Sequence, residues 1–297
     1  MAQVLIHIGY PKAGSTYLHE WFTSHPCMLY NTHAISGFYH THDLARYAES
    51  SSYIHDCFVL SNEDLSVWKG DVDIVGIKNA RFYDVKNYQE NLSETLHRIY
   101  PEAKVLIVTR GYTTYFQSLY SQYVSSGGAL SFDDFKSKFG SVFPDAYDYT
   151  FIVSLYRKIF GSENVILLPF ELLKDNPTEF TAAIEEQIGI KERFKYKTER
   201  VNASFDKKIL FAYRRISSGL VKLVSPLPYS WQKMIYGFYI QCLNKKRPHP
   251  WMEILGKWMN TDIKMGGVEE ILESLKGKSE ILRNEKLYQP YLKEYLL

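Results

Sequence analysis

The stretch that most constrains the fold is residues 4–18, VLIHIGYPKAGSTYL. An apolar run at 4–8 predicts a buried strand, and a loop with two glycines, one proline and one lysine follows it. Residues 14–24 predict a helix whose apolar face carries Tyr17, Leu18, Trp21 and Phe22, and which ends before Pro26. The order is therefore strand, loop, helix. A helix start of this kind suits phosphate or sulfate, because its backbone N–H groups are unpaired.

The rest of the first two thirds of the chain alternates in the same way. Strands are expected at 57–61, 73–78, 104–110 and 164–170, and helices at 88–100, 113–124, 132–139, 146–160 and 177–188. The run at 104–110 is continuously apolar before it ends in arginine, as central parallel strands tend to be. This alternation predicts an α/β fold with a central parallel sheet flanked by helices.

Residues 1–204 are expected to form this core, and 205–297 a mostly helical C-terminal part of the same domain. Lysines and arginines stand among aromatic residues through 206–260, and the tail from 282 to 297 is expected to be a short helix. The basic helical part could cover a bound nucleotide, contact an anionic membrane surface, or be a solvated appendage.

Composition excludes several classes of protein. The net charge of +2 on 297 residues does not favour a general nucleic-acid binder. Cys27, Cys57 and Cys242 are scattered, so neither a disulfide framework nor a zinc site is expected. The first strand begins at residue 4, before which a signal peptide has no room, and no apolar run reaches membrane-spanning length. A reducing cytoplasm is the expected compartment, with contact at the inner membrane face as an extension of it.

The loop differs from the phosphate loop of kinases. Gly9 and Gly14 have the same spacing, but Ser15 and Thr16 follow directly where a kinase has lysine, and Lys12 lies inside the loop. Lys12 can supply the positive charge that a metal supplies in a kinase, so no metal is required. A P-loop kinase or NTPase and a non-catalytic binding protein remain the rival interpretations.

Residues 10–18, YPKAGSTYL, resemble the 5′-phosphosulfate loop of sulfotransferases that use 3′-phosphoadenylyl sulfate (PAPS). The resemblance extends to a strand ending in Arg110 with Ser118 eight residues on, which in that family bind the 3′-phosphate, and to the segment 167–177. It implies PAPS as cosubstrate, bound by Pro11, Lys12, Ala13, Gly14, Ser15, Thr16, Tyr17, Arg110 and Ser118. A guanidinium with a hydroxyl donor suits a doubly charged phosphate.

The reaction implied is sulfuryl transfer to an acceptor hydroxyl, with Lys12 stabilising the charge on the leaving oxygen. The general base is expected to be Glu63, which follows an apolar strand much as a Ser-x-Glu stretch does in bacterial sulfotransferases. His33, just after the first helix, is the second candidate, and His40 or His42 in the same loop is the third. The residue at 79 is asparagine, so a histidine base of the aryl-type members is missing.

The acceptor is less constrained. Tyrosine- and histidine-rich loops suit a sugar ring, which favours a bacterial cell-surface glycan or glycolipid precursor, with a small phenol or alcohol metabolite as the alternative. The C-terminal third resembles the family only at 201–204 and faintly at 242–250, where Lys246 replaces a glycine. No pattern indicates an oligomeric state.

Overall fold

A computed structural model describes residues 3–32, 34–35, 37–40, 42–43, 46–47, 55–66, 84–196, 205–243, 250–259 and 261–297. Its centre is a five-stranded sheet in the order β2-β3-β1-β4-β5, with every neighbouring pair parallel. The strands are β1 (Gln3–Gly9), β2 (Met28–Leu29), β3 (Cys57–Asn62), β4 (Lys104–Thr109) and β5 (Val165–Pro169). The predicted α/β fold with a central parallel sheet is confirmed.

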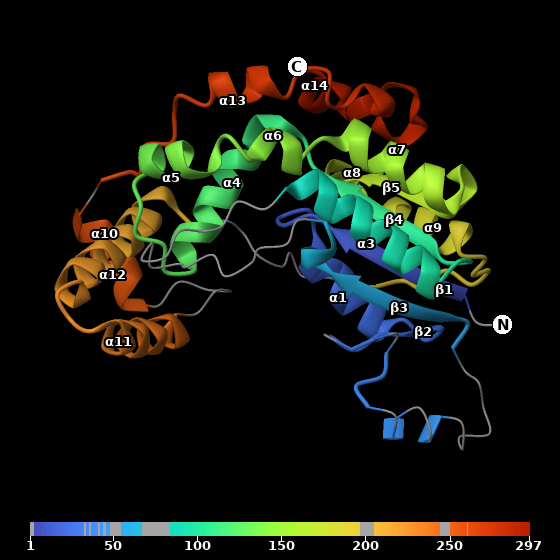
Figure 1. The fold of residues 1–297 in the computed structure, drawn as a ribbon, viewed down its shortest axis with the longest axis horizontal. Helices are drawn as coiled ribbons and strands as arrows, with labels where there is room; N and C mark the ends of the chain where they lie inside the picture. Colours follow the sequence, from blue (N-terminus) through green and yellow to red (C-terminus); the bar gives the residue numbers. More distant parts are fainter. Residues whose placement is uncertain are drawn as a thin grey trace.

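Helices cover both sides of the sheet, with α1 below it and α3 and α7 above it in Figure 1. The helices of the core are α1 (Ser15–Ser24), α3 (Val85–Ile99), α4 (Tyr112–Ser125), α5 (Phe132–Phe139), α6 (Phe143–Ala146), α7 (Tyr149–Phe160), α8 (Phe170–Asp175) and α9 (Pro177–Gln187). Burial agrees with the expected apolar face of α1, because Leu18, Trp21 and Phe22 are buried in the core.

The C-terminal part is helical, as expected. It contains α10 (Lys207–Val224), α11 (Tyr229–Cys242), α12 (Pro250–Met259), α13 (Glu269–Ser274) and α14 (Leu292–Tyr295). In Figure 1, α10, α11 and α12 lie together at the end of the molecule away from the sheet, whereas the last residues return over α4 and α7. The chain end therefore contributes to the core, and the division at 204/205 stays a prediction.

Several element boundaries differ from the expectation. The stretch 146–160 is not one helix. Ala146 is the last residue of α6, and α7 begins at Tyr149, where the Asp148 side chain caps it by accepting a hydrogen bond from Phe151 N at 3.0 Å. The tail is not one helix: two 3₁₀ segments, Glu280–Asn284 and Lys286–Tyr291, precede the single turn of α14. Pro290 lies in the second segment and has no N–H for an α-helical bond. The strand expected at 73–78 falls outside the described residues.

Register explains where a site can form. Ile8 of β1 pairs with Asn62 of β3, and Gly9 pairs with Val108 of β4. The central strand and both of its neighbours therefore end at one edge of the sheet. The chain leaves β1 for β3 on one side and later for β4 on the other, and in open α/β sheets ligands bind at such a switch point.

Candidate active site

The loop after β1 has a backbone that only certain residues adopt. Lys12 has φ 63° and Gly14 has φ 89°, both in the left-handed region. A Cβ atom on Gly14 would meet Leu173 Cδ2 at 2.5 Å and Phe170 Cδ2 at 3.3 Å, so glycine is required there both for conformation and for space. Lys12 holds the same conformation with a side chain, and such backbone strain concentrates at functional sites.

Side chains from three other elements bind the carbonyls of the loop. They are Ser66 Oγ to Gly9 O at 2.9 Å, Tyr115 OH to Pro11 O at 2.6 Å, and Arg110 Nη1 to Lys12 O at 2.7 Å. These bonds fix the positions of the three loop carbonyls.

At the start of α1, Gly14 has no side chain with which to cap the helix. The first N–H groups of α1 can therefore bind an anion.

Arg110 joins the two distant sequence motifs. Its Nη1 donates to Lys12 O at 2.7 Å and to Ser118 Oγ at 3.2 Å, which brings the loop and the first turns of α4 to one guanidinium. The same guanidinium lies 4.9 Å from the centre of the Phe170 ring and 5.7 Å from that of Tyr115. Aromatic faces on this cation fix the plane in which its donors lie.

The backbone around Arg110 is equally constrained. Tyr149 OH donates to Arg110 O at 2.8 Å and accepts from Arg110 N at 3.2 Å. The next amide, Gly111 N, donates to the buried carboxylate of Glu171 at 3.0 Å. Burial raises the pKa of Glu171, while hydrogen bonds from Tyr295 and from Gly111 N oppose the shift. Arg110 is thus positioned from both sides of its own peptide.

Glu63 lies beside the loop, as expected for a residue that follows β3. Its Oε1 accepts a hydrogen bond from the Oγ atom of Ser15, which is the first residue of α1. Burial lowers the pKa of Lys12 from its usual 10.5, the Arg110 charge lowers it further, and the Glu63 carboxylate opposes both effects. Arg110 and Glu63 therefore both act electrostatically on Lys12, at the edge where β1, β3 and β4 end.

A polar chain joins His7 of β1, Ser61 of β3 and His19 of α1. Ser61 Oγ is 2.7 Å from His7 Nδ1 and 2.9 Å from His19 Nε2. Burial, with a smaller contribution from His19, lowers the pKa of His7 from 6.5 to about 3. His7 Nε2 has no hydrogen-bond partner within the described parts of the chain. The His7 ring is therefore neutral at physiological pH and packs beneath the Gly9 backbone, where a Cβ would meet it at 2.7 Å.

The remaining candidate bases are less closely tied to the site. His33 lies outside the described residues, as do residues 201–204 and most of 242–250. His40 and His42 have exposed side chains, and the His40 amide binds Asp43 Oδ2 within its own loop at 3.0 Å. The structure brings Pro11–Tyr17, Arg110, Ser118 and Glu63 together, and it does not bring His40 or His42 to them through any contact shown. The roles expected for all of these residues stay predictions.

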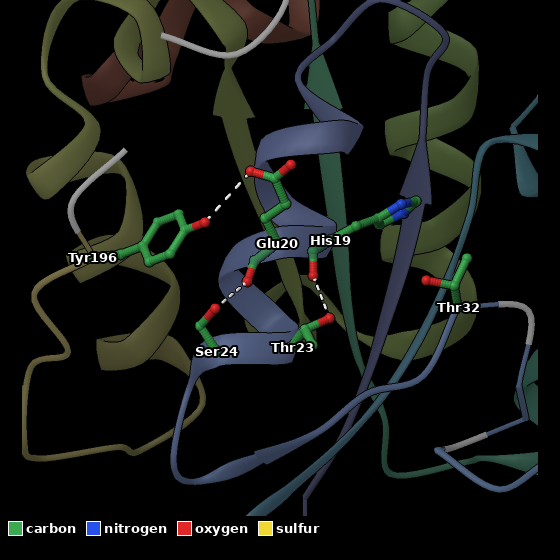
Figure 2. A pocket seen from close by; sticks show the side chains of 6 residues that line it. All are labelled: His19, Glu20, Thr23, Ser24, Thr32 and Tyr196. Atoms are coloured by element: carbon green, nitrogen blue, oxygen red, sulfur yellow. Dashed lines mark hydrogen bonds between the residues drawn. The ribbon is translucent and has the colours of Figure 1, made fainter. Parts of the chain in front are cut away.

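A hollow of about 250 Å³ runs along the second half of α1. His19, Glu20, Thr23, Ser24, Thr32 and Tyr196 line it, and Figure 2 shows His19 and Thr32 on one side of the helix with Tyr196 on the other. Tyr196 OH lies 3.4 Å from Glu20 Oε2. The hollow is open and belongs to the last turns of α1, whereas Lys12 precedes the first turn.

Two kinds of feature are absent among the described residues. No group of three or more His, Cys, Asp or Glu side chains is placed to hold a metal ion there. No helix among those residues is long and apolar enough to cross a membrane.

Comparison with known proteins finds similarity in structure but not in sequence families. No protein-family model matches the chain, and no curated protein matches it. Among solved structures, it is similar to a sulfotransferase from Alicyclobacillus acidocaldarius, at 14% identity and a TM-score of 0.48. That alignment covers 78% of this chain and 99% of the other. At this identity the similarity assigns no role to any residue.

Sequence reasoning missed the residues that hold the site in place. They contact the loop, Arg110 or the next residue, Gly111: Tyr115, Tyr149, Phe170, Glu171 and Ser66. One signal was available for Tyr115, which lies three residues before Ser118 and so on the same side of α4. For Glu171, the pairing with Gly111 across 60 residues has no trace in local spacing.

Proposed function

We propose that this protein is a sulfotransferase that moves a sulfuryl group from PAPS to an acceptor hydroxyl. The observation that carries the proposal is the Arg110 guanidinium, which donates both to the Lys12 carbonyl and to Ser118 Oγ. PAPS carries a 5′-phosphosulfate and a separate 3′-phosphate. A loop with unpaired helix-start amides and an adjacent arginine–hydroxyl pair match these two anionic groups.

The residues present account for charge during the transfer. The acceptor oxygen bonds to sulfur while the bond from sulfur to the phosphate oxygen breaks, so negative charge collects on the leaving adenosine 3′,5′-bisphosphate. The Lys12 ammonium lies in the loop that would hold this phosphate and can stabilise the charge. Removing one such fixed donor typically raises a barrier by about 3–4 kcal/mol.

We propose Glu63 as the residue that takes the proton of the acceptor hydroxyl. It is a carboxylate at the carboxyl end of β3, it interacts electrostatically with Lys12, and its Oε1 is fixed by Ser15. General bases of this kind contribute roughly 10²–10⁴-fold to a rate. His33 is the alternative, and the paired variants Glu63→Gln and His33→Gln distinguish the two.

A P-loop kinase or NTPase is less well supported. Such an enzyme uses a lysine in the first helical turn and a hydroxyl on Mg²⁺ beside it. In this chain Ser15 begins α1, and its hydroxyl is bound to Glu63. The lysine instead has a left-handed backbone inside the loop.

For the acceptor we propose a glycan or a lipid-linked glycan, with a small phenol or alcohol as the alternative. The tyrosine- and histidine-rich segment after α1 and the hydroxyl-lined hollow of Figure 2 support a polyhydroxylated ligand. We place the reaction in the cytoplasm, since Cys27, Cys57 and Cys242 are all free thiols.

Nucleotide binding tests the proposal directly. Isothermal titration with adenosine 3′,5′-bisphosphate, ADP and ATP, each in Mg²⁺ and in EDTA, should show the bisphosphate binding most tightly and without need of Mg²⁺. Arg110→Met should weaken the bisphosphate by about 10- to 100-fold and ADP, which has no 3′-phosphate, by much less. Arg98→Met, at an exposed site on α3, is the matched control.

Two results would count against the proposal. Tighter binding of ATP with Mg²⁺ would favour a kinase or NTPase. Equal weakening of ADP binding and of bisphosphate binding by Arg110→Met would show that Arg110 does not contact a 3′-phosphate.

The acceptor is then identified by incubating the protein with labelled PAPS and with glycan, lipid or metabolite extracts, and by determining the mass of the labelled product.

A further inference from the structure

Exposed apolar side chains gather on the C-terminal helices. Thirteen large hydrophobic side chains are exposed among the residues that the structure describes, and nine of them fall between 223 and 258. Three of the five tryptophans of the chain, Trp231, Trp251 and Trp258, are in this group. Soluble proteins rarely leave so many large apolar side chains together on one part of their surface without a partner.

The spacing shows that these side chains form stripes. On α11, Trp231, Met234 and Phe238 follow the i, i+3, i+7 pattern, and on α12, Trp251, Ile254 and Trp258 repeat it. We call these six residues the apolar face. Phe238 is 70% and Trp258 81% exposed. Both helices also have a buried side, because Tyr236 and Met252 are 0% exposed, so the apolar face is additional to the packing side.

Positive charge is concentrated in the part of the chain that carries the apolar face. Helices α10 and α11 carry six Lys and Arg residues and no Asp or Glu. Over residues 205–259 the sequence has ten of the 35 basic residues and two of the 33 acidic ones, a net charge of +8 against −6 for the rest of the chain. Lys222, Lys233 and Lys257 are exposed, each next to an exposed apolar residue.

We propose that the apolar face of α11 and α12 binds the surface of an anionic lipid bilayer. Tryptophan and phenylalanine insert at the boundary between headgroups and acyl chains, and lysines beside them attract anionic headgroups. A second copy of the chain is less suited, because two faces of the same positive charge would repel. Since no described helix can cross a membrane, the binding is peripheral.

The bilayer-binding helices are attached to the candidate site. Tyr236 OH of α11 donates to Gly127 O at the end of α4, and Ile240 and Leu243 also pack there. Ser118 lies about midway along the same helix. Bilayer binding does not depend on the proposed function. If both hold, the connection through α4 orients the enzyme toward an acceptor held in a lipid membrane.

Vesicle flotation tests the proposal. The full chain is mixed with vesicles of phosphatidylcholine alone or with about a third phosphatidylglycerol, at 0.1 M and 0.5 M NaCl. We expect binding to the anionic vesicles, a blue shift of tryptophan emission, and loss of binding at the higher salt. Trp231→Ser/Phe238→Ser and Lys222→Glu/Lys233→Glu should each lower the partition coefficient by about tenfold or more.

Matched controls separate this face from surface changes in general. Ile99→Ser removes an exposed apolar side chain from α3, and Lys158→Glu/Lys174→Glu reverses two exposed charges on α7 and α8. Both should bind vesicles as the unmodified chain does. Circular dichroism and adenosine 3′,5′-bisphosphate titration check that all variants are folded. Absence of binding to anionic vesicles, equal binding by the face and control variants, or a dimer that only the face variants dissociate would overturn the proposal.

Discussion

The buried imidazole of His7 should make the stability of this protein depend on pH. In the folded protein the pKa of His7 is lowered from 6.5 to about 3, chiefly by burial. At pH values between these two numbers the unfolded chain takes up a proton that the folded chain does not. The free energy of unfolding therefore falls as the pH falls from 6.5 toward 3.

The magnitude follows from the two pKa values. Over the whole window, the shift from 6.5 to about 3 corresponds to up to ~5 kcal/mol of lost stability. Between pH 7.5 and pH 5 the loss is ~2 kcal/mol. Because the folded-state pKa lies well below 5, this second figure is set almost entirely by titration of the unfolded chain. It can be measured under conditions in which most carboxylates are still ionised.

The assay compares the protein with His7→Gln, which cannot be protonated and keeps an amide that can bond Ser61. Urea unfolding at pH 7.5, 6 and 5, followed by circular dichroism, gives the free energy of unfolding of each. The unmodified protein should be the more stable at pH 7.5, and its advantage should shrink by ~2 kcal/mol at pH 5. His42→Gln, at an exposed position, is the control for the change from histidine to glutamine itself. A constant difference for His7→Gln would refute the reasoning.

The site makes three further predictions. Lys12→Ala should lower kcat by about 10²–10³-fold, with bisphosphate binding partly retained. Because the pKa of Lys12 is lowered, the activity of the unmodified enzyme should fall on the alkaline side below pH 10.5. An unchanged kcat in Lys12→Ala would show that Lys12 takes no part in the reaction. Glu63→Gln should lower kcat by roughly 10²–10⁴-fold. It should also move the alkaline loss of activity to lower pH, since the Glu63 carboxylate raises the pKa of Lys12. Retained turnover would point to another base. Gly14→Ala should destabilise the fold by at least about 1–2 kcal/mol and weaken nucleotide binding. Adding Leu173→Ala should restore only the part of the stability that was lost to the clash with Leu173. Full restoration would show that the backbone conformation of residue 14 causes no strain.

The strands and long helices were predictable because their signals are local. The continuous apolar run before Arg110 and the 3.6-residue spacing in α1 each indicate one element within a few turns of chain. Where several signals overlap, prediction was wrong: α6 ends at Ala146 and Asp148 caps the start of α7, inside a stretch that reads as continuous. In the tail, Pro290 and aromatic burial replace a regular helix with 3₁₀ segments.

Only the parts of the site that carry its chemistry were visible in the sequence. Lys12, Arg110 and Ser118 stand out because their residue types and spacing have a chemical reason. The aromatic rings around Arg110 do not, because tyrosine and phenylalanine are also ordinary core residues. Phe170 became part of the site only when β5 placed it against Arg110, and such a contact depends on strand order.

The chain end shows how such long-range contacts determine the geometry of the site. Tyr295, three residues from the C-terminus, donates to Glu171 Oε2 at 2.5 Å, and the other oxygen of that carboxylate accepts from Gly111 N. Thr109 Oγ1 is also 2.7 Å from Tyr288 OH. Both residues flanking Arg110 are therefore held by contacts that involve the last ten residues of the chain. This bracing fixes the position of the Arg110 charge, because neither neighbour can shift without breaking a buried hydrogen bond.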